Sequence, residues 1–347
     1  MVSKSILFVS TLLATTLVTL PQSQQPSKRE EPALKLSTDL VTLDAVVLSK
    51  KSGLPVTGLR KEDFILNEEG VKQEISHFSY DSLPLSVVLL VDRSASVNTP
   101  LQEIQAASIQ ALKHLKPQDE VALMGFAPTA WLIQEFTSDR QQITDKMAVE
   151  NGWINHMGPA PGWSTSQANG PTCIADGIHT AAEYLSKATN PIGRRVMIVI
   201  TDNATECSHH SKKEVTDKLF ESGAVVYGLK IRGIDDGVTG GIAKVALLTP
   251  FKQNGGNVNG YADETGGVVL DGRKQKAAEK LTEIINQLRQ RYSIGYLPSN
   301  PQMDGRFRKI KLKVTPEVEK RVGGVVTLTR QGYYARRHDT TATPIAK

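Results

Sequence analysis

Between residues 85 and 291, short apolar segments alternate with longer amphipathic segments. The apolar segments are 85–91, 120–126, 195–201, 224–231 and 267–270, and the amphipathic ones are 101–115, 175–185, 212–222 and 274–291. A strand that is apolar on both faces must be covered on both faces, and the intervening helices can provide that cover. The pattern therefore predicts an α/β fold, in which helices flank a doubly wound, Rossmann-like and mostly parallel sheet.

The segments on either side of this unit have a different pattern. Residues 36–49 alternate apolar and polar side chains over much of their length, which is typical of a half-buried strand. Neither flank has enough strands to bury a stable core alone. We therefore expect a β segment at 35–83 to pair with one at 292–337 in a β-sandwich-like domain. The α/β unit occupies 84–291, and a disordered tail follows at 338–347.

The first 26 residues are typical of a secretory signal. Lys4 precedes an apolar stretch at 6–20, and a polar exit at 21–26 follows it, although no A-x-A cleavage pattern marks the cut. The alternative is an uncleaved membrane anchor, but the apolar stretch is shorter than the roughly 20 residues that span a bilayer comfortably. We expect a secreted or periplasmic protein that contacts the membrane only through such an anchor.

The charge pattern does not favour nucleic-acid binding. The chain has 41 Lys and Arg against 36 Asp and Glu, a formal net charge of +5. The basic residues are scattered or paired and form no long run, so the charge contributes to solubility rather than marking a nucleic-acid surface. We expect no nucleic-acid partner.

Polar side chains stand where apolar strands end. Asp92 ends the first strand of the α/β unit, and Ser94 and Ser96 follow at spacings that point to the same side of an extended loop. Asp202 follows the third apolar strand, and Thr172 shortly precedes a predicted helix. Ligands of doubly wound sheets bind at the carboxyl ends of the strands. The five side chains are therefore predicted to converge on one oxygen-rich pocket.

Such a pocket suits a hard cation. Carboxylate and hydroxyl oxygens, without sulfur or imidazole, favour Mg²⁺, Mn²⁺ or Ca²⁺ over zinc. We expect Mg²⁺ first, with Mn²⁺ and Ca²⁺ as alternatives. Because most of these ligands are neutral hydroxyls, the dication keeps a demand for one more carboxylate. The expected partner is a protein that presents an Asp or Glu side chain.

The sequence DRSAS at residues 92–96, with Thr172 and Asp202 after it, resembles the metal-ion-dependent adhesion site (MIDAS) of the von Willebrand factor A (VWFA) domain. The resemblance covers about residues 84–291. It implies that two serines and a threonine contact the metal directly and that two aspartates act directly or through water. By position these residues are Ser94, Ser96, Thr172, Asp92 and Asp202.

Four further segments outside this site carry a narrower resemblance. They are similar to bacterial exported proteins that carry a VWFA-related domain, and they read PVTGLRKEDFILNEEGVKQEISHF, DETGGVVL, RYSIGYLPSNPQMDGRFRKIKLKV and RQGYYA. This resemblance extends over most of the mature chain. It implies an extracytoplasmic protein, and together with the MIDAS it implies an adhesion or protein–protein interaction role.

Both cysteines lie in loops that should approach the metal. Cys173 follows Thr172, and Cys207 lies five residues beyond Asp202. In an oxidising compartment they could form a disulfide between the two loops. The alternative is two buried thiols, since the sequence does not show whether the Cα atoms lie within the roughly 7 Å that a disulfide allows.

The segment CSHHS at 207–211 invites a zinc interpretation with His156 as a further ligand. Its spacing matches no familiar zinc pattern. A solvated loop followed by a helix cap is the better interpretation.

A loop rich in Gly and Pro at 151–171 leads directly into Thr172 and carries Trp153 and Trp163. Loops carry binding specificity on rigid scaffolds, and Trp is favoured at binding hot spots. The two tryptophans therefore form a candidate rim for partner binding. The alternative is a surface loop whose tryptophans pack locally.

We expect a binding protein rather than an enzyme. Ser94 does not lie in a G-x-S-x-G elbow, and no His or acid is placed by the sequence to activate it. One alternative is a metal-dependent enzyme in which the cation polarises a substrate oxygen. Another is an envelope structural or assembly protein that uses the fold without metal.

Overall fold

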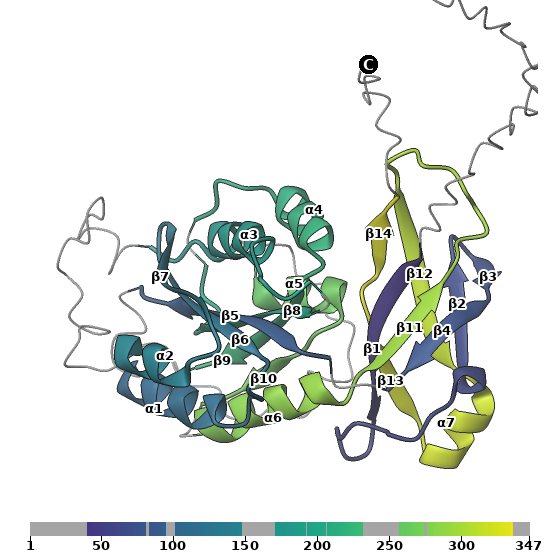
Figure 1. Cartoon of the computed structure of the whole chain (residues 1–347), viewed down its shortest axis with the longest axis horizontal. Coiled ribbons are helices and arrows are strands. Elements are labelled where there is room, and N and C mark those ends of the chain that lie inside the picture. The colour runs from purple at the N-terminus through teal and green to yellow at the C-terminus, as the bar shows by residue number, and fades with distance from the viewer. Residues whose placement is uncertain are drawn as a thin grey trace, which may run out of the picture. The chain divides into compact units, whose positions relative to one another are not determined.

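The computed structural model describes residues 40–80, 83–94, 101–147, 171–191, 193–205, 207–231, 257–273 and 276–335 (Figure 1). All described residues belong to one compact unit, which spans Asp39–Lys347. The predicted signal at 1–26 and the predicted tail at 338–347 lie outside the described residues. Across the described ranges, we find no helix that combines the length and the apolar character needed to cross a membrane.

A central sheet organises the α/β region. Its strands in the described residues run in the order β10-β9-β8-β5-β6-β7. They are β5 (Leu85–Asp92), β6 (Glu120–Phe126), β7 (Ala130–Thr137), β8 (Arg194–Thr201), β9 (Val225–Lys230) and β10 (Val269–Asp271). Every neighbouring pair is parallel except β6 and β7, which are antiparallel. The prediction of a mostly parallel doubly wound sheet is confirmed.

Helices cover both faces of this sheet (Figure 1). One face carries α3 (Ile174–Leu185), α4 (Lys212–Ser222) and α5 (Val258–Thr265), and the other carries α1 (Leu101–Leu112), α2 (Arg140–Met147) and α6 (Ala277–Arg289). Strand β5 shows why a layer of helices is needed on each face of the sheet. Val88 and Leu90 belong to the core on the α3 side, whereas Val87 and Leu89 belong to the core on the α1 and α6 side. Each such side chain contributes about 1.5–3 kcal/mol by leaving water.

The flanking segments form two further antiparallel sheets. The first has the order β13-β1-β11-β4 and the second has the order β14-β12-β2-β3. Their strands are β1 (Val41–Ser49), β2 (Phe64–Glu68), β3 (Val71–Gln73), β4 (Ile75–Ser79), β11 (Tyr292–Tyr296), β12 (Phe307–Val314), β13 (Val325–Leu328) and β14 (Gly332–Tyr334). In each sheet, strands from the N-terminal flank pair with strands from the C-terminal flank. The predicted β-sandwich-like arrangement, built from both flanks, is confirmed.

Buried polar contacts join strand β1 to the α/β region. The Arg194 guanidinium donates to the Asp44 carboxylate at 2.8 Å and to the carbonyl oxygens of Leu288 and Arg291 at 3.3 Å each. Arg291 donates to the Tyr227 hydroxyl at 2.6 Å and to the Asp44 carbonyl oxygen at 3.0 Å. Two buried cations are therefore satisfied only when β1 and the α/β region are both folded.

The sequence analysis missed several elements of the described residues, among them β7, α2, α5 and α7 (Pro316–Val322). No position of β7 is fully buried, because it is the antiparallel edge strand, so it lacks the apolar run that marks its neighbours. The signals for α7 were present. Pro316 occupies its first turn, and Gly323 ends it in a left-handed conformation with φ of 76°.

Candidate metal centre

Asp92 is held rigidly at the carboxyl end of β5. One carboxylate oxygen accepts a hydrogen bond from the Ser94 backbone N–H at 2.9 Å, and the other accepts one from the Thr201 hydroxyl at 2.6 Å. Asp92 is fully buried, and Ser94 is nearly so. The bond to the Ser94 N–H turns the chain directly after the strand, so the loop that carries the predicted ligands begins with a fixed geometry.

The electrostatics of Asp92 favour a nearby cation. The pKa of its carboxyl group is raised to about 6, mainly by burial and to a smaller extent by the negative charge of Asp202, while the hydrogen bonds from Thr201 and Ser94 oppose the rise. The effect of Asp202 shows that the two carboxylates are close enough to repel. A dication between them would offset both the burial of the charge and the repulsion.

The loop after β8 presents Asp202. Its carboxylate accepts a hydrogen bond from the Ala204 backbone N–H at 3.0 Å. Asn203 has a φ of 66°, a left-handed conformation that Asn tolerates better than most residues. The Asn203 side chain also accepts from the Val258 backbone N–H at 3.1 Å and donates to Asn259 at 3.1 Å. The turn beside Asp202 is thus attached to the start of α5.

Thr172 lies in the segment that enters α3 and is buried. The next N–H, that of Cys173, donates to the Ala127 carbonyl oxygen at 2.9 Å, just beyond the end of β6. The Thr172 carbonyl oxygen accepts from the Thr205 hydroxyl at 3.4 Å, which links it to the Asp202 loop. Gly177 lets α3 approach closely, because a Cβ there would lie 2.9 Å from the Phe126 ring.

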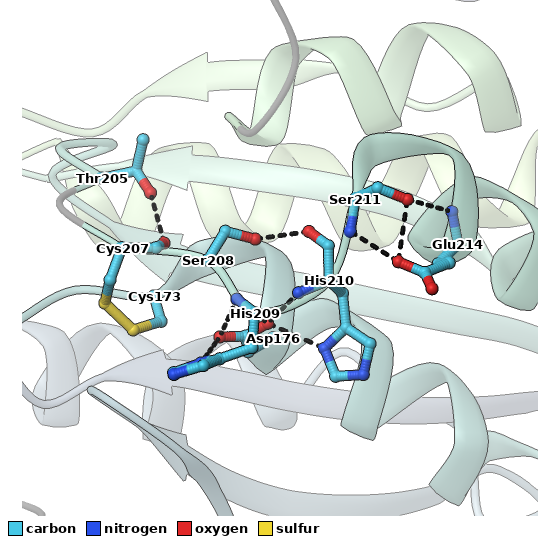
Figure 2. Close-up of polar contacts among 9 residues, drawn as sticks. All are labelled: Cys173, Asp176, Thr205, Cys207, Ser208, His209, His210, Ser211 and Glu214. Atoms are coloured by element: carbon cyan, nitrogen blue, oxygen red, sulfur yellow. Dashed lines mark hydrogen bonds and ion pairs between the residues drawn. A yellow bond between two sulfur atoms is a disulfide. The ribbon is translucent and has the colours of Figure 1, made fainter.

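A disulfide joins the loops of Thr172 and Asp202 covalently. It connects Cys173 and Cys207, whose Cα atoms are 4.7 Å apart across 34 positions of sequence (Figure 2). The loops that carry Thr172 and Asp202 are therefore cross-linked beside the strand ends.

The Asp176 carboxylate organises the segment after Cys207 (Figure 2). It accepts hydrogen bonds from the backbone N–H groups of His209 and His210, at 3.0 Å, and contacts their Nδ1 atoms at 2.8 and 2.7 Å. Burial acts to raise the pKa of Asp176, but these hydrogen bonds outweigh it and lower the pKa. Ser211 then begins α4 as its N-cap, with Glu214 completing a capping box. The predicted helix cap is confirmed.

The comparison with known families adds a decisive observation. Residues 87–204 match the model of the von Willebrand factor type A domain. This segment is a VWFA domain. We call the α/β region that contains it, from β5 to α6, the VWFA region, and its central sheet the VWFA sheet. The match includes Asp92, Ser94, Thr172 and Asp202, and its fold agrees with the doubly wound sheet described above. No curated protein matches the sequence.

Solved structures resemble the VWFA region at low sequence identity. The conserved hypothetical protein BatB from Bacteroides thetaiotaomicron is 17% identical, with 59% of this chain and 98% of that one covered and a TM-score of 0.39. An aerotolerance-related membrane protein from Bacteroides fragilis is 19% identical, with 58% and 99% covered and a TM-score of 0.41. Proximal thread matrix protein 1 from the mussel byssus, with a zinc-occupied MIDAS motif, is 15% identical, with 60% and 48% covered and a TM-score of 0.41. Similarity at this level carries no argument about function.

The structure places four of the five predicted ligands at one edge of the VWFA sheet. Asp92 and Ser94 follow β5, Asp202 follows β8, and Thr172 enters α3 beside the end of β6. Ser96 lies outside the described residues, as do the candidate rim residues Trp153 and Trp163 and the histidine His156.

The sequence analysis missed three residues that support this edge. They are Thr201, which donates to Asp92, Asn203, which fixes the Asp202 turn, and Asp176, which holds the histidine segment. Thr201 could have been found, since a hydroxyl residue directly before Asp202 ends the same buried strand. Asn203 and Asp176 act through contacts to distant parts of the chain, so no local pattern marks them.

The donor set of the VWFA domain fits a hard dication. The described donors are two carboxylates and two hydroxyls, at Asp92, Asp202, Ser94 and Thr172. The Thr201 hydroxyl donates to Asp92, and its oxygen accepts from the Asn203 backbone N–H, so in this structure it orients a proposed ligand. Oxygen ligands of this kind suit Mg²⁺, Mn²⁺ and Ca²⁺.

Proposed function

We propose that the VWFA domain binds a divalent cation at its sheet edge and uses it to capture an acidic side chain of a partner protein. The ligands in this proposal are Asp92, Ser94, Ser96, Thr172 and Asp202. The observation that carries it is a fully buried Asp92 carboxylate that shares one sheet edge with Ser94, Thr172 and Asp202. The raised pKa of Asp92, about 6, supports it. Such an arrangement is costly unless a cation compensates it.

The balance of charge favours an acidic partner. The two Asp carboxylates formally balance the charge of a dication. Asp202 is partly exposed to water, which weakens its attraction to the ion, and the other proposed ligands are neutral hydroxyls. When bound, the ion would supply Lewis acidity toward an incoming carboxylate oxygen. We propose Mg²⁺ as the first candidate, with Mn²⁺ and Ca²⁺ as alternatives. The partner is a protein that presents Asp or Glu.

A binding role is favoured over catalysis. The Nδ1 atoms of His209 and His210 face Asp176, and the same carboxylate accepts both backbone N–H groups. Both imidazoles use Nδ1 on this one carboxylate, and the candidate nucleophile Ser94 lies in no G-x-S-x-G elbow, which favours binding over hydrolysis. We therefore propose that the protein is not an enzyme.

Export is part of the proposal. The predicted signal at 1–26 would direct the chain out of the cytoplasm. The disulfide between Cys173 and Cys207 supports the same location, because disulfides persist in oxidising compartments. We propose a secreted or periplasmic protein.

The metal step is tested by thermal unfolding with and without Mg²⁺, Mn²⁺ or Ca²⁺. A ligand at 100 times its Kd stabilises the folded chain by about 2.7 kcal/mol. We expect stabilisation in the wild type and none in Asp92→Ala, while the exposed Asp145→Ala variant on α2 should respond as the wild type does. An equal response of wild type and Asp92→Ala would contradict the metal site.

The partner step is tested by capture from the native envelope with wild type, Ser94→Ala and the exposed control Ser186→Ala. We expect a partner that is retained by wild type and Ser186→Ala, lost with Ser94→Ala, and released by chelator. Replacing one Asp or Glu of that partner by Asn or Gln should abolish capture. Partners held equally by all three proteins would exclude metal-mediated capture.

A further inference from the structure

A second group of metal-binding side chains lies beside the disulfide. One Asp176 carboxylate oxygen, one His209 ring nitrogen and the Cys173 sulfur lie within 4.8 Å of one another. Cys207 supplies the other sulfur of the disulfide, so it is bonded to a member of the group (Figure 2). Two loops thus bring two sulfurs, an imidazole and a carboxylate together. The zinc interpretation weighed from the sequence combined the CSHHS segment at 207–211 with His156 as a fourth ligand, and it did not include Cys173 or Asp176.

These donors suit zinc rather than a hard cation. Zn²⁺ in structural sites binds four ligands tetrahedrally, with Zn–S near 2.3 Å and Zn–N or Zn–O near 2.0–2.2 Å. Ligand atoms on such an ion are about 3.3–3.8 Å apart. The Cys173, His209 and Asp176 ligand atoms lie within 4.8 Å of one another, and His209 Nδ1 is 2.8 Å from Asp176, so shifts of about 1 Å bring these three to that spacing. The two sulfurs move apart when their bond breaks. The proposed MIDAS contains no sulfur and no imidazole, so the two sites differ in chemistry.

In the oxidised chain the two sulfurs are bonded to each other and are poor ligands. We propose that reduction of the Cys173–Cys207 disulfide creates a Zn²⁺ site in which Cys173, Cys207, His209 and Asp176 are the four ligands. The loops that carry Thr172 and Asp202 are then tied by a covalent bond when oxidised and by zinc when reduced. This site does not depend on the function proposed above.

The chemical step is a thiol–disulfide exchange with a dithiol. The dithiol gives two electrons and becomes a disulfide, while the Cys173–Cys207 S–S bond breaks and each sulfur takes a proton from the dithiol. Zn²⁺ then binds the two sulfurs as thiolates and releases those two protons to solvent.

The side chains around the proposed zinc site give the ion a route from solvent. Cys173 is buried and the Asp176 side chain is 8% exposed, whereas the His209 side chain is 76% exposed, so the ion can enter from the histidine side. His210 contacts the other oxygen of Asp176 and stacks on His179, with ring centroids 3.9 Å apart. His210 thereby helps to orient the Asp176 carboxylate, as residues that hydrogen-bond to metal ligands commonly do.

Cobalt titration of the full chain tests the proposal. Co²⁺ replaces Zn²⁺ in tetrahedral sites, and only a sulfur ligand gives thiolate-to-cobalt absorption, so binding at the MIDAS does not contribute. The chain is reduced with a phosphine, which is not itself a thiol ligand, and compared with the oxidised chain. We expect thiolate-to-cobalt absorption that saturates at one Co²⁺ per reduced chain and is displaced by Zn²⁺. The oxidised chain should show none.

Variants separate this site from non-specific thiol binding. His209→Ala should weaken Co²⁺ binding by at least about tenfold. The matched variant His114→Ala, at an exposed histidine just after α1, should retain the stoichiometry and the affinity of the wild type. The double variant Cys173→Ser/Cys207→Ser should show no absorption.

Three outcomes would overturn the site. The first is that the reduced chain shows no thiolate-to-cobalt absorption, whether it stays folded or unfolds. The second is that the oxidised chain shows equal absorption. The third is that the two histidine variants change Co²⁺ binding equally. None of them bears on the Mg²⁺ measurements, which use the oxidised protein.

Discussion

The two regions of this protein bury their strands in opposite ways. All eight positions of β5 in the VWFA region are buried, whereas β12 in the β-sandwich region alternates exposed and buried side chains along its whole length. The first strand is enclosed by helices on both faces, and the second has one face in water. The strand that ends in the proposed ligands is thus the one with the least freedom to move.

The two regions also differ in how the chain assembles them. The VWFA sheet uses strands between Leu85 and Asp271, whereas β1 of the sandwich pairs with β11 and β13 from the far end of the chain. The sandwich therefore needs both flanks of the chain, and the VWFA region is inserted between them.

The largest expected effect is on the doubly covered strand. Leu90→Ala should lower the free energy of unfolding by about 2–5 kcal/mol, because it opens a cavity between β5 and α3. Lys311→Ala, on the exposed face of β12, should change it by less than about 0.5 kcal/mol. Urea unfolding measures both. Similar losses in the two variants would remove the contrast between the sheets.

A second variant tests the link between the regions. Arg194→Ala should cost about 3 kcal/mol, since it removes the ion pair to Asp44 and the hydrogen bonds to two buried carbonyl groups. The neighbouring variant Arg195→Ala removes one hydrogen bond, to the Ser222 carbonyl oxygen, and should cost about 1 kcal/mol. Calorimetry should also show the two regions unfolding less cooperatively in Arg194→Ala. A single sharp transition at the Arg195→Ala midpoint would argue against this link.

Metal binding should stabilise one region selectively. At 100 times its Kd, Mg²⁺ should slow hydrogen exchange at the N–H groups of Ser94, Cys173 and Ala204. For an N–H group that exchanges only by global unfolding, the slowing should correspond to about 2.7 kcal/mol. For an N–H group that exchanges by smaller openings, the slowing should be less. Amides on the exposed face of β12 that exchange by local opening should keep the same exchange rate when Mg²⁺ is added. Hydrogen-exchange measurements on both groups of amides test this prediction. Equal protection in the sandwich would mean that the two regions respond as one unit.

The pKa of Asp92 predicts the pH dependence of metal binding. Burial raises this pKa to about 6, and the metal binds the ionised form, so affinity should fall by about tenfold per pH unit below pH 6. In the metal-free chain, a rise in pH has the opposite effect, because it lowers the contribution of Asp92 to the stability of the fold. A raised carboxyl pKa stabilises the fold at low pH, and this contribution is lost as pH rises from about 4 to 6.

Calorimetric titration of Mg²⁺ at pH 5 and pH 7 measures the first effect and should give affinities about tenfold apart. In Asp92→Asn the metal-free stability change between pH 4 and 6 should shrink. Equal affinities at the two pH values would show that Asp92 is not a ligand.

The smallest expected effect compares helix caps in the two regions. Ser211 accepts a hydrogen bond from the Glu214 N–H at the start of α4, so Ser211→Ala should cost about 1 kcal/mol. Thr315 begins α7 of the sandwich without a side-chain cap bond, so Thr315→Ala should cost only a few tenths of a kcal/mol. Thermal unfolding of both variants decides between these values. A larger loss in Thr315→Ala would reverse the order.

Much of the fold was predictable because it depends on local patterns. Runs such as Leu85–Asp92 are apolar on both faces and therefore require a covered parallel strand. The ligand edge followed from the same argument, since Asp92 and Asp202 come directly after two such strands. Strand β7 is as long as β5 but was missed because, as an edge strand, it has no buried apolar run, and helix α5 was missed because it has only eight residues.

The sequence alone determined the alternation of strands and helices and the placement of Asp92, Ser94 and Asp202 at strand ends. These follow from the chain direction and from side-chain periodicity, which act over a few residues. Only the tertiary structure decided that Cys173 meets Cys207 and that Asp176 holds the two histidines across 33 and 34 positions of sequence. Those contacts arise where separate loops meet, and their distances are set by the packing of α3 against the sheet rather than by either loop.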